Sequence, residues 1–297
     1  MDAITVEGLV KHYGPTVALD GLSFTIGAGR LTGFLGPNGA GKTTTFRLLL
    51  GLTRPDAGSM EVLGMRVGPD TSRIVKQVGA IVEEPGLHRT LSAADNLRVA
   101  ALTLGVDGDE IPELLRFVAL DDVAHRRVEG YSKGMRQRLA LAVAMLGDPE
   151  ALILDEPLDG LDPAGQVALK AQLRRLVEER GKTIIVSSHD LSDVEQLADD
   201  VVVVDRGRRV VSGALREVLD DGGRHRVRVG ERDRAVDLLR AAGLGVEVEG
   251  DELLVSGAEG SQISRVLAGS GVYPSLLAPE TVTLERVFLE LTGETGS

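Results

Sequence analysis

The sequence predicts an α/β protein with a parallel sheet at its core, and three apolar runs predict it. Residues 31–35, 151–154 and 183–186 have the length and character of buried parallel strands. Each run ends in polar residues, and open α/β sheets bind their ligands at the carboxyl ends of the strands. The first run also leads through a glycine-rich turn into a helix-like stretch, 44–50. That order of strand, turn and helix is typical of α/β folds.

The glycine-rich turn has the pattern of a phosphate-binding loop, Gly36-Pro37-Asn38-Gly39-Ala40-Gly41-Lys42-Thr43, followed by Thr44. Its glycines allow backbone angles closed to other residues, so successive N–H groups can surround a polyphosphate at the positive end of a helix. Lys42 would reach the β and γ phosphates, and Thr43 offers a hydroxyl to Mg²⁺. The alternative is a loop that merely turns the chain. The match at all four specified positions favours ATP or another NTP.

Composition limits the classes of protein that fit. The chain has 297 residues, 43% of them hydrophobic, which suffices for one large or two modest domains. It has no cysteine, which excludes disulfides, zinc-thiolate sites and a cysteine nucleophile. A net charge of −12 argues against a surface that follows a nucleic-acid backbone. No apolar run approaches the ~20 residues that span a bilayer, so we expect a protein that is soluble by itself.

The N-terminal residues predict strands at 4–6 and 22–26, with turns at 14–15 and 27–29. Tyr13 lies among these turns. An aromatic side chain there can stack on a nucleotide base, although ordinary packing explains it nearly as well. A further turn is expected at 54–58.

Carboxylates follow two apolar runs. The run 78–82 ends in Glu83 and Glu84, which is either a solvated turn or a carboxylate brought to a metal. The run 151–154 ends in Asp155 and Glu156. Asp155 can hold hydrated Mg²⁺, and Glu156, which points the other way on a strand, can accept a proton from an attacking water.

His189 follows the third apolar run, so it should leave the same edge of the sheet as the two carboxylates. A lone histidine is usually structural, but at this edge a contact with the γ-phosphate is the better explanation.

Helix starts are predicted at Ser92 and Ser132. Ser132 with Gly134 at a helix start makes an anion site, which alone is weak evidence because most capped helices bind nothing.

The last part of the chain differs in composition from the rest. Residues 220–297 contain no lysine and are more acidic per residue, so a domain boundary is predicted at 220–224. Strands are expected at 225–229 and within 246–255, and helices at 234–241, 261–267 and the end of the chain.

The order of these motifs resembles the ATP-binding cassette (ABC) ATPases over residues 4–215. The motifs that carry the resemblance are 36–43, 132–137, 152–156, 161–162 and His189. The resemblance implies a P-loop NTPase of the ABC ATPase fold in residues 1–219, with a parallel-sheet core, an N-terminal antiparallel β portion and a helical subdomain at about 87–148. A small α+β accessory domain would occupy 220–297.

The resemblance also implies roles for the site residues. Tyr13 matches the adenine-stacking aromatic, Asp155 the metal ligand, Glu156 the catalytic base and His189 the γ-phosphate switch, with Lys42 and Thr43 on the phosphates and Mg²⁺. Ser132 and Gly134 match the signature that, in the family, contacts ATP on the opposite subunit. The resemblance therefore implies a homodimer related by a two-fold axis.

The sequence departs from the common family pattern at two positions. Both departures resemble variants that occur in bacterial drug, bacitracin-type and lantibiotic-immunity exporters. Glu83 stands where the family commonly has glutamine, and a carboxylate there can still bind Mg²⁺ while its charge re-tunes hydrolysis. Met135 also stands where glutamine is common. The segment 283–293 resembles the close of daunorubicin-type resistance ATPases, although an amphipathic helix on its own sheet explains it too.

The function that the resemblance implies is the ATPase subunit of an exporter of a drug, antibiotic or similar compound. Separately encoded polytopic permease subunits would make its only contact with the membrane, at the cytoplasmic face, and no nucleic acid is expected. The alternatives are a non-transport ABC ATPase acting on ribosomes or DNA, and an ABC importer subunit.

Overall fold

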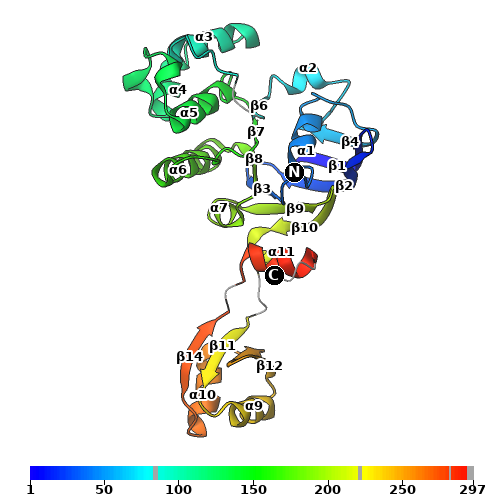
Figure 1. Cartoon of the computed structure of the whole chain (residues 1–297), viewed down its shortest axis with the longest axis vertical. Coiled ribbons are helices and arrows are strands. Elements are labelled where there is room, and N and C mark those ends of the chain that lie inside the picture. The colour runs from blue at the N-terminus through cyan, green and yellow to red at the C-terminus, as the bar shows by residue number, and fades with distance from the viewer. Residues whose placement is uncertain (83–85, 220–222, 281, 293–297) are drawn as a thin grey trace. The chain divides into compact units, whose positions relative to one another are not determined.

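The computed structural model describes residues 1–82, 86–219, 223–280 and 282–292 (Figure 1). These residues form two compact units. Met1–Leu215 make up nearly all of the first unit, and Arg216–Glu290 make up nearly all of the second. The boundary predicted from composition, at 220–224, lies a few residues later in the chain.

A six-stranded sheet forms the centre of the first unit, in the order β10-β9-β3-β8-β7-β6. All pairs in it are parallel except β9 with β10. Its strands are β3 (Leu31–Leu35), β6 (Val78–Ile81), β7 (Ala151–Leu154), β8 (Thr183–Ser188), β9 (Asp200–Asp205) and β10 (Arg208–Ala214). Every residue of β3, β7 and β8 is buried. Burial on both faces explains why these runs are apolar without alternation.

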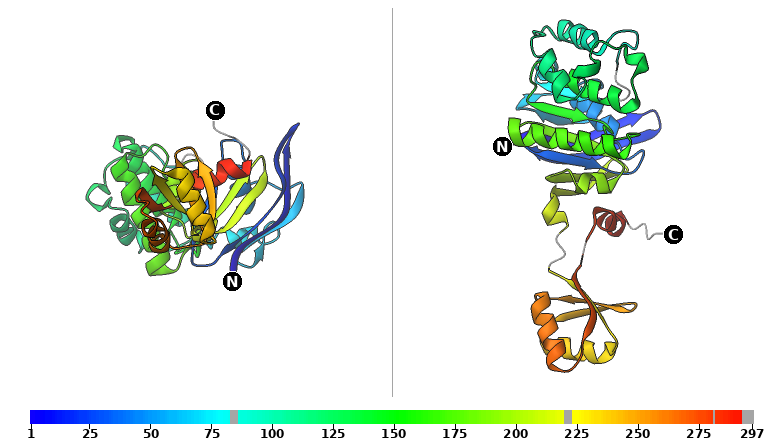
Figure 2. Two further views of the ribbon diagram at one scale, coloured as in Figure 1. Left: turned by 90° about the horizontal axis from the view of Figure 1, so that it is seen from below. Right: turned by 90° about the vertical axis from the view of Figure 1, so that its left-hand side faces the viewer.

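An antiparallel sheet lies to one side of the first unit (Figures 1 and 2), in the order β2-β1-β4-β5. Its strands are β1 (Asp2–Tyr13), β2 (Thr16–Gly27), β4 (Ala57–Val62) and β5 (Met65–Arg66). Gly58, expected in a turn, lies in β4. A Cβ atom there would stand 2.5 Å from Gly8 O, so this glycine lets β4 approach β1 and is not a turn signal.

Helix α1 (Lys42–Leu49) packs between this antiparallel sheet and the central sheet. Three aromatic rings connect the layers: the ring centroids of Phe24 and Phe34 are 5.3 Å apart, and those of Phe34 and Phe46 are 5.5 Å apart. Phe34 and Phe46 are fully buried. This packing fixes the start of α1 against the end of β3, which positions the loop between them.

Helices gather on the opposite side of the first unit, where they share a second core (Figure 2). They are α3 (Ala93–Leu104), α4 (Ile111–Phe117), α5 (Lys133–Ala144) and α6 (Pro163–Arg180), with the short 3₁₀ turns Asp121–Val123 and Val128–Gly130. Ser92 and Ser132 cap α3 and α5, as predicted, by accepting from the N–H of Asp95 and Met135. Asp162 caps α6 in the same way.

The short helices of the chain are α2 (Thr71–Ile74), α7 (Leu191–Glu195) and α8 (Leu215–Val218). None of the helices in the described ranges is long and apolar enough to cross a membrane.

The second unit is a four-stranded antiparallel sheet with two helices on one face. Its elements are β11 (His225–Val229), α9 (Arg232–Ala241), β12 (Gly245–Glu249), β13 (Glu252–Ser256), α10 (Gly260–Gly269), β14 (Pro274–Pro279) and α11 (Leu284–Thr292). The βαββαβ sequence and the order β12-β13-β11-β14 are those of a ferredoxin-like fold. Strand β14 was not among the expected strands. Prolines stand at both its ends, and prolines are tolerated on such an edge strand.

Candidate functional site

The glycine-rich loop leaves β3 and enters α1 with backbone angles that glycine adopts without strain and other residues do not. Gly39 and Gly41 have φ of 83° and 105°. A Cβ atom at Gly41 would stand 2.6 Å from Leu19 Cδ2 and 2.8 Å from Ala18 O. Glycine at 41 is therefore required by the close approach of β2 as well as by its own conformation.

The loop fits a polyphosphate. Among the described residues, the backbone N–H groups of Gly39, Gly41, Lys42, Thr43 and Thr44 donate to no protein acceptor. These N–H groups surround the start of α1, whose dipole adds partial positive charge, and no acidic residue lies in its first turn. The loop also closes on itself through a hydrogen bond of 3.1 Å from Ala40 N–H to Pro37 O. Asn38 is exposed beside it.

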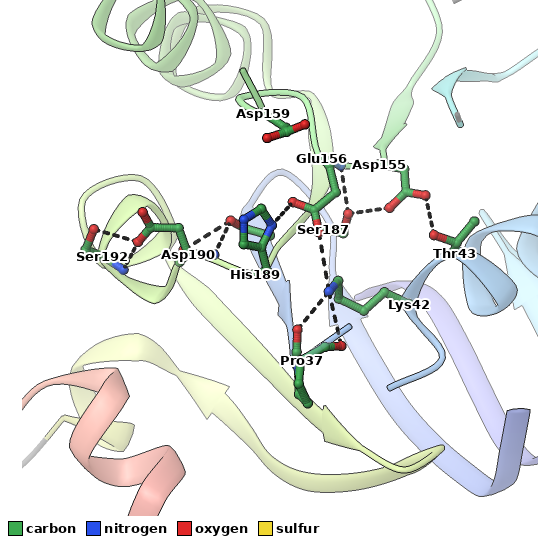
Figure 3. A network of polar contacts seen from close by, with 12 residues as sticks. Pro37, Lys42, Thr43, Asp155, Glu156, Asp159, Ser187, His189, Asp190 and Ser192 are labelled. Carbon is green, nitrogen blue, oxygen red and sulfur yellow. Dashed lines mark hydrogen bonds and ion pairs between the residues drawn. The ribbon is translucent and has the colours of Figure 1, made fainter. Parts of the chain in front are cut away.

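The Lys42 side chain is buried, with 7% of it exposed. Its Nζ donates to Gly36 O at 2.7 Å and lies 3.3 Å from Glu156 Oε1 (Figure 3). The ammonium therefore sits between the loop and the candidate base. A cation in this place can pair with phosphate oxygens as well as with Glu156.

Asp155 follows β7 and joins the start of α1 to the end of β8. Thr43 Oγ1 donates to Asp155 Oδ2 at 2.6 Å, and Ser187 Oγ donates to Asp155 Oδ1 at 2.5 Å (Figure 3). The Thr43 hydroxyl and the Asp155 carboxylate thus lie beside each other near the phosphate loop. Mg²⁺ takes few protein oxygens when it also binds phosphates, so these residues fit the predicted ion. No group of three or more acidic or histidine side chains suited to a metal occurs in the described ranges.

Glu156 adopts a left-handed backbone conformation, with φ of 48°. Such a conformation costs a non-glycine residue about 1–3 kcal/mol and persists only where the surroundings hold it. Here Ser187 Oγ accepts from Glu156 N–H at 2.8 Å. The sequence predicted that strand alternation would set the direction of the Glu156 side chain. That prediction is wrong, because β7 ends at Leu154. The left-handed backbone at Glu156 sets the direction instead.

The Glu156 carboxylate is held on both oxygens. Its Oε2 lies 2.9 Å from His189 Nδ1, and its Oε1 lies near Lys42 Nζ (Figure 3). His189 follows β8, which pairs in parallel with β7, so both residues leave the same edge of the sheet. A carboxylate between a histidine and a lysine can accept a proton and is oriented to do so.

Asp190 fixes the segment after His189. It caps α7 by accepting from Ser192 N–H at 2.9 Å and from the Ser192 hydroxyl at 2.7 Å. The hydroxyl contact is the main cause that lowers the pKa of Asp190 below its usual range. The ionised cap holds α7, and with it the chain that carries the imidazole.

Ser187 was not predicted as a site residue. It bridges Asp155 and Glu156, and the signal for it was indirect: β7 and β8 pair with Leu154 opposite Val186, which places residues 155 and 187 side by side. Only the register of the two strands, which the sequence does not state, reveals this contact.

Tyr13, Ser132 and Gly134 were predicted to bind the nucleotide. In the described part of the chain they do not contact the cluster of side chains around Asp155 and Glu156. Tyr13 ends β1, is 44% exposed, and has Lys11 Nζ 5.3 Å from its ring centroid. Ser132 and Gly134 lie at the start of α5 and make no hydrogen bond or ion pair with the residues around Glu156. A Cβ atom at Gly134 would meet nothing closer than Leu161 Cδ2, at 3.5 Å. Packing within the chain therefore does not require glycine at 134.

Glu83, the remaining predicted metal ligand, lies outside the described residues. Strand β6, which ends two residues before it, pairs with β7 so that Ile81 stands opposite Leu154.

A groove lies in the first unit, between β6 and the helices α3 and α5. This groove has a volume of ≈ 520 Å³. Its lining is mostly apolar and includes Val78, Ala80, Val99, Ala100 and Val143. Apolar side chains at its rim are exposed to solvent, Leu104 by 40%.

Known proteins resemble the chain over nearly its whole length. Residues 19–159 match the family described as ABC transporter. The daunorubicin resistance ATP-binding protein DrrA3 of Streptomyces coeruleorubidus is 38% identical over 307 residues, which cover 98% of this chain and 96% of that protein. The Nod factor export ATP-binding protein I of Rhizobium sp. (strain N33) is 37% identical over 298 residues, covering 98% and 97%.

Two further likenesses agree. The bacitracin transport ATP-binding protein BcrA of Bacillus licheniformis is 42% identical over 206 residues, covering 69% of this chain and 67% of that protein. A solved structure described as the ATP-binding subunit of an ABC transporter is 30% identical, with a TM-score of 0.66, and covers 73% of this chain and 91% of that one. The predicted α/β ATPase fold is confirmed. With relatives this similar over nearly its full length, the chain belongs to the family of ABC transporter ATP-binding proteins.

Proposed function

We propose that two copies of this ATPase dimerise around two MgATP and power export of a drug, antibiotic or similar compound through separately encoded membrane subunits. Mg²⁺, held by Thr43 and Asp155 with Glu83 as a third candidate, would supply positive charge on the phosphates. Lys42 and the loop N–H groups bind and orient the phosphates. Glu156 takes the proton of the attacking water, and His189 holds Glu156 in place.

The observation that carries the proposal is the separation of the predicted nucleotide ligands into two groups. Lys42, Thr43, Asp155, Glu156 and His189 converge at one edge of the sheet. Ser132 and Gly134 make no contact with them within the described residues, although the start of α5 leaves N–H groups for an anion. A two-fold axis would bring this helix start of one copy to the nucleotide of the other. Tyr13 would stack on the adenine from the exposed end of β1.

The apolar groove beside β6 is where we place the permease. Its exposed rim favours an apolar helix of a partner. Movement of that helix would act on β6, the strand that precedes the candidate metal ligand Glu83 in the sequence.

The cargo follows the permease rather than this chain. The relatives named for daunorubicin, bacitracin and Nod factors are 37–42% identical to it and differ little in that respect. Relatives that are about equally similar to this chain are thus named for chemically different compounds. The three names state drug resistance, transport and export, which favours an exporter over the ribosome, DNA or importer alternatives.

The central test uses Glu156→Gln, which removes the base and keeps the shape. In saturating ATP and Mg²⁺ this variant should accumulate as a dimer, because hydrolysis falls by about 10²–10⁴ when a general base is lost. The matched control is Glu179→Gln, which removes an exposed carboxylate of α6 and should behave as the wild type. A Glu156→Gln variant that stays monomeric at saturating ATP would contradict the proposal.

The permease is tested by co-purification from membranes. Val99→Glu places a charge in the groove and should lower the yield of the membrane partner. Val167→Glu, at an exposed position of α6 outside the groove, is the control. Equal loss with both variants would show that the groove is not the docking site.

A further inference from the structure

Lys133 stands between Ser132 and Gly134, as the first residue of α5. Its Nζ lies 3.4 Å from Asp159 Oδ2, and no other ion-pair partner occurs for it in the described part of the chain. The two side chains are 53% and 58% exposed. A pair so exposed and so long contributes little, because water screens both charges. The Lys133 ammonium can therefore exchange Asp159 for an anion that binds it more tightly.

The Lys133 stem lies across the turn that carries the candidate base. A Cβ atom at Gly160 would stand 2.1 Å from Lys133 Nζ and 2.9 Å from its Cε, so the end of this side chain lies directly against the turn. Asp159 N–H donates to Glu156 O at 3.1 Å. Figure 3 shows Asp159 on the same loop as Glu156. The lysine thus connects the start of α5 with the turn that begins at Glu156.

The surroundings of Lys133 suit an anion that the free subunit does not supply. The start of a helix is its positive end, where a cation is disfavoured, and the first turn of α5 holds no acidic residue. The N–H groups of Lys133 and Gly134 donate to no acceptor among the described residues. Asp159 is the one carboxylate of the described chain within ion-pair distance of the Lys133 ammonium.

We propose that Lys133 binds a phosphate oxygen of the ATP held by the second copy, and that Asp159 occupies the lysine in the free subunit. This rests on the proposed function, because only a second copy brings a nucleotide to α5. On dimerisation Lys133 exchanges the Asp159 carboxylate for phosphate, and the turn after Glu156 loses its tie to α5. Assembly and the position of the base are thereby linked through one side chain.

The two partners of the pair should respond in opposite directions. In the Glu156→Gln background, Lys133→Met should raise the ATP concentration for half-maximal dimerisation by about tenfold or more, since a hydrogen bond to a charged group is lost at each nucleotide. Asp159→Asn frees the lysine and should lower that concentration by about two- to threefold. Lys133→Arg keeps a cation and should restore most of the affinity.

The control is Lys182→Met, which removes a lysine paired with Asp148 at 2.7 Å, away from α5. Dimerisation is measured by sedimentation of the full-length chain over a range of ATP concentrations. If Lys133→Met and Asp159→Asn both weaken the dimer, the pair is a structural contact and the proposal fails. It also fails if Lys133→Met dimerises like its parent. A Glu156→Gln parent that never dimerises would instead overturn the proposed function, and this inference with it.

Discussion

Thr43 Oγ1 donates a hydrogen bond of 2.6 Å to Asp155 Oδ2, although 112 residues separate them in the sequence. The contact joins the first turn of α1 to the end of β7, and Ser187 holds the other oxygen of the same carboxylate. The bond places a hydroxyl oxygen beside a carboxylate oxygen at the edge of the phosphate loop. This pair of oxygens predicts how ATP turnover depends on the concentration of Mg²⁺.

Asp155→Asn should raise the Mg²⁺ concentration needed for ATP turnover by at least about tenfold. The amide keeps the size of the side chain but removes the charge that a hard divalent cation prefers. Steady-state turnover is measured over a Mg²⁺ titration at fixed ATP. Asp148→Asn, an exposed aspartate paired with Lys182, is the control and should leave the titration unchanged. An unchanged Mg²⁺ titration for Asp155→Asn would remove this residue from the metal site.

Lys42→Ala should abolish ATP turnover. The ammonium is buried between Gly36 O and the Glu156 carboxylate, so no solvent cation replaces it on the phosphates. The measurement is phosphate release at saturating ATP, with Lys182→Ala as the control for loss of one positive charge. Near-normal turnover of Lys42→Ala would contradict the assignment of the loop.

Ser187→Ala should lower turnover by about tenfold, with a smaller change in the KM for ATP. Its hydroxyl orients Asp155 and accepts from the N–H of Glu156, so its loss misplaces two groups that act on the γ-phosphate. Ser187→Thr keeps the hydroxyl and should recover most of the rate. Ser188→Ala is the matched control, because the Ser188 hydroxyl donates to Asp190 O instead. Equal rates for the two alanine variants would show that Ser187 does not position the site.

Glu83→Gln should leave ATP binding intact and change hydrolysis or its coupling to transport. If Glu83 is the metal ligand that we propose, the substitution removes one negative charge from the metal side of the site and keeps an oxygen that Mg²⁺ can bind. Nucleotide affinity, turnover and transport are measured on the same preparation with its permease. If turnover and transport were both unchanged, Glu83 would be a surface carboxylate.

Glu280→Ala should destabilise the second unit by about 3–5 kcal/mol, the usual cost of removing one partner from a buried ion pair. The Glu280 side chain is fully buried and lies within ion-pair distance of Arg224, Arg226 and Arg286. Chemical denaturation of the full chain measures the loss. Glu247→Ala, at a side chain 72% exposed and 3.9 Å from Arg224, is the control and should change stability little. Equal effects would show that the burial of Glu280 is not what matters.

Sequence alone determined the features that depend on local chain chemistry. Glycines at 39 and 41, the serine caps at 92 and 132 and the apolar runs of the central sheet each act within a few residues, so their patterns predicted loop, helix starts and buried strands. The order of the motifs then identified the family before any geometry was known. Pattern reasoning failed at β14 and Gly58, where proline and glycine serve an edge strand and a close strand contact rather than turns.

Tertiary structure decided which side chains meet. The bridge of Ser187 between Asp155 and Glu156 depends on the register of β7 and β8. Both strands are buried throughout, so their sequences show no alternation from which that register could be inferred. The left-handed backbone of Glu156 likewise persists only because a residue from another strand accepts its N–H. Contacts between distant segments carry no local signal, so the pairings of Lys42 with Glu156 and of Lys133 with Asp159 appear only in the folded chain.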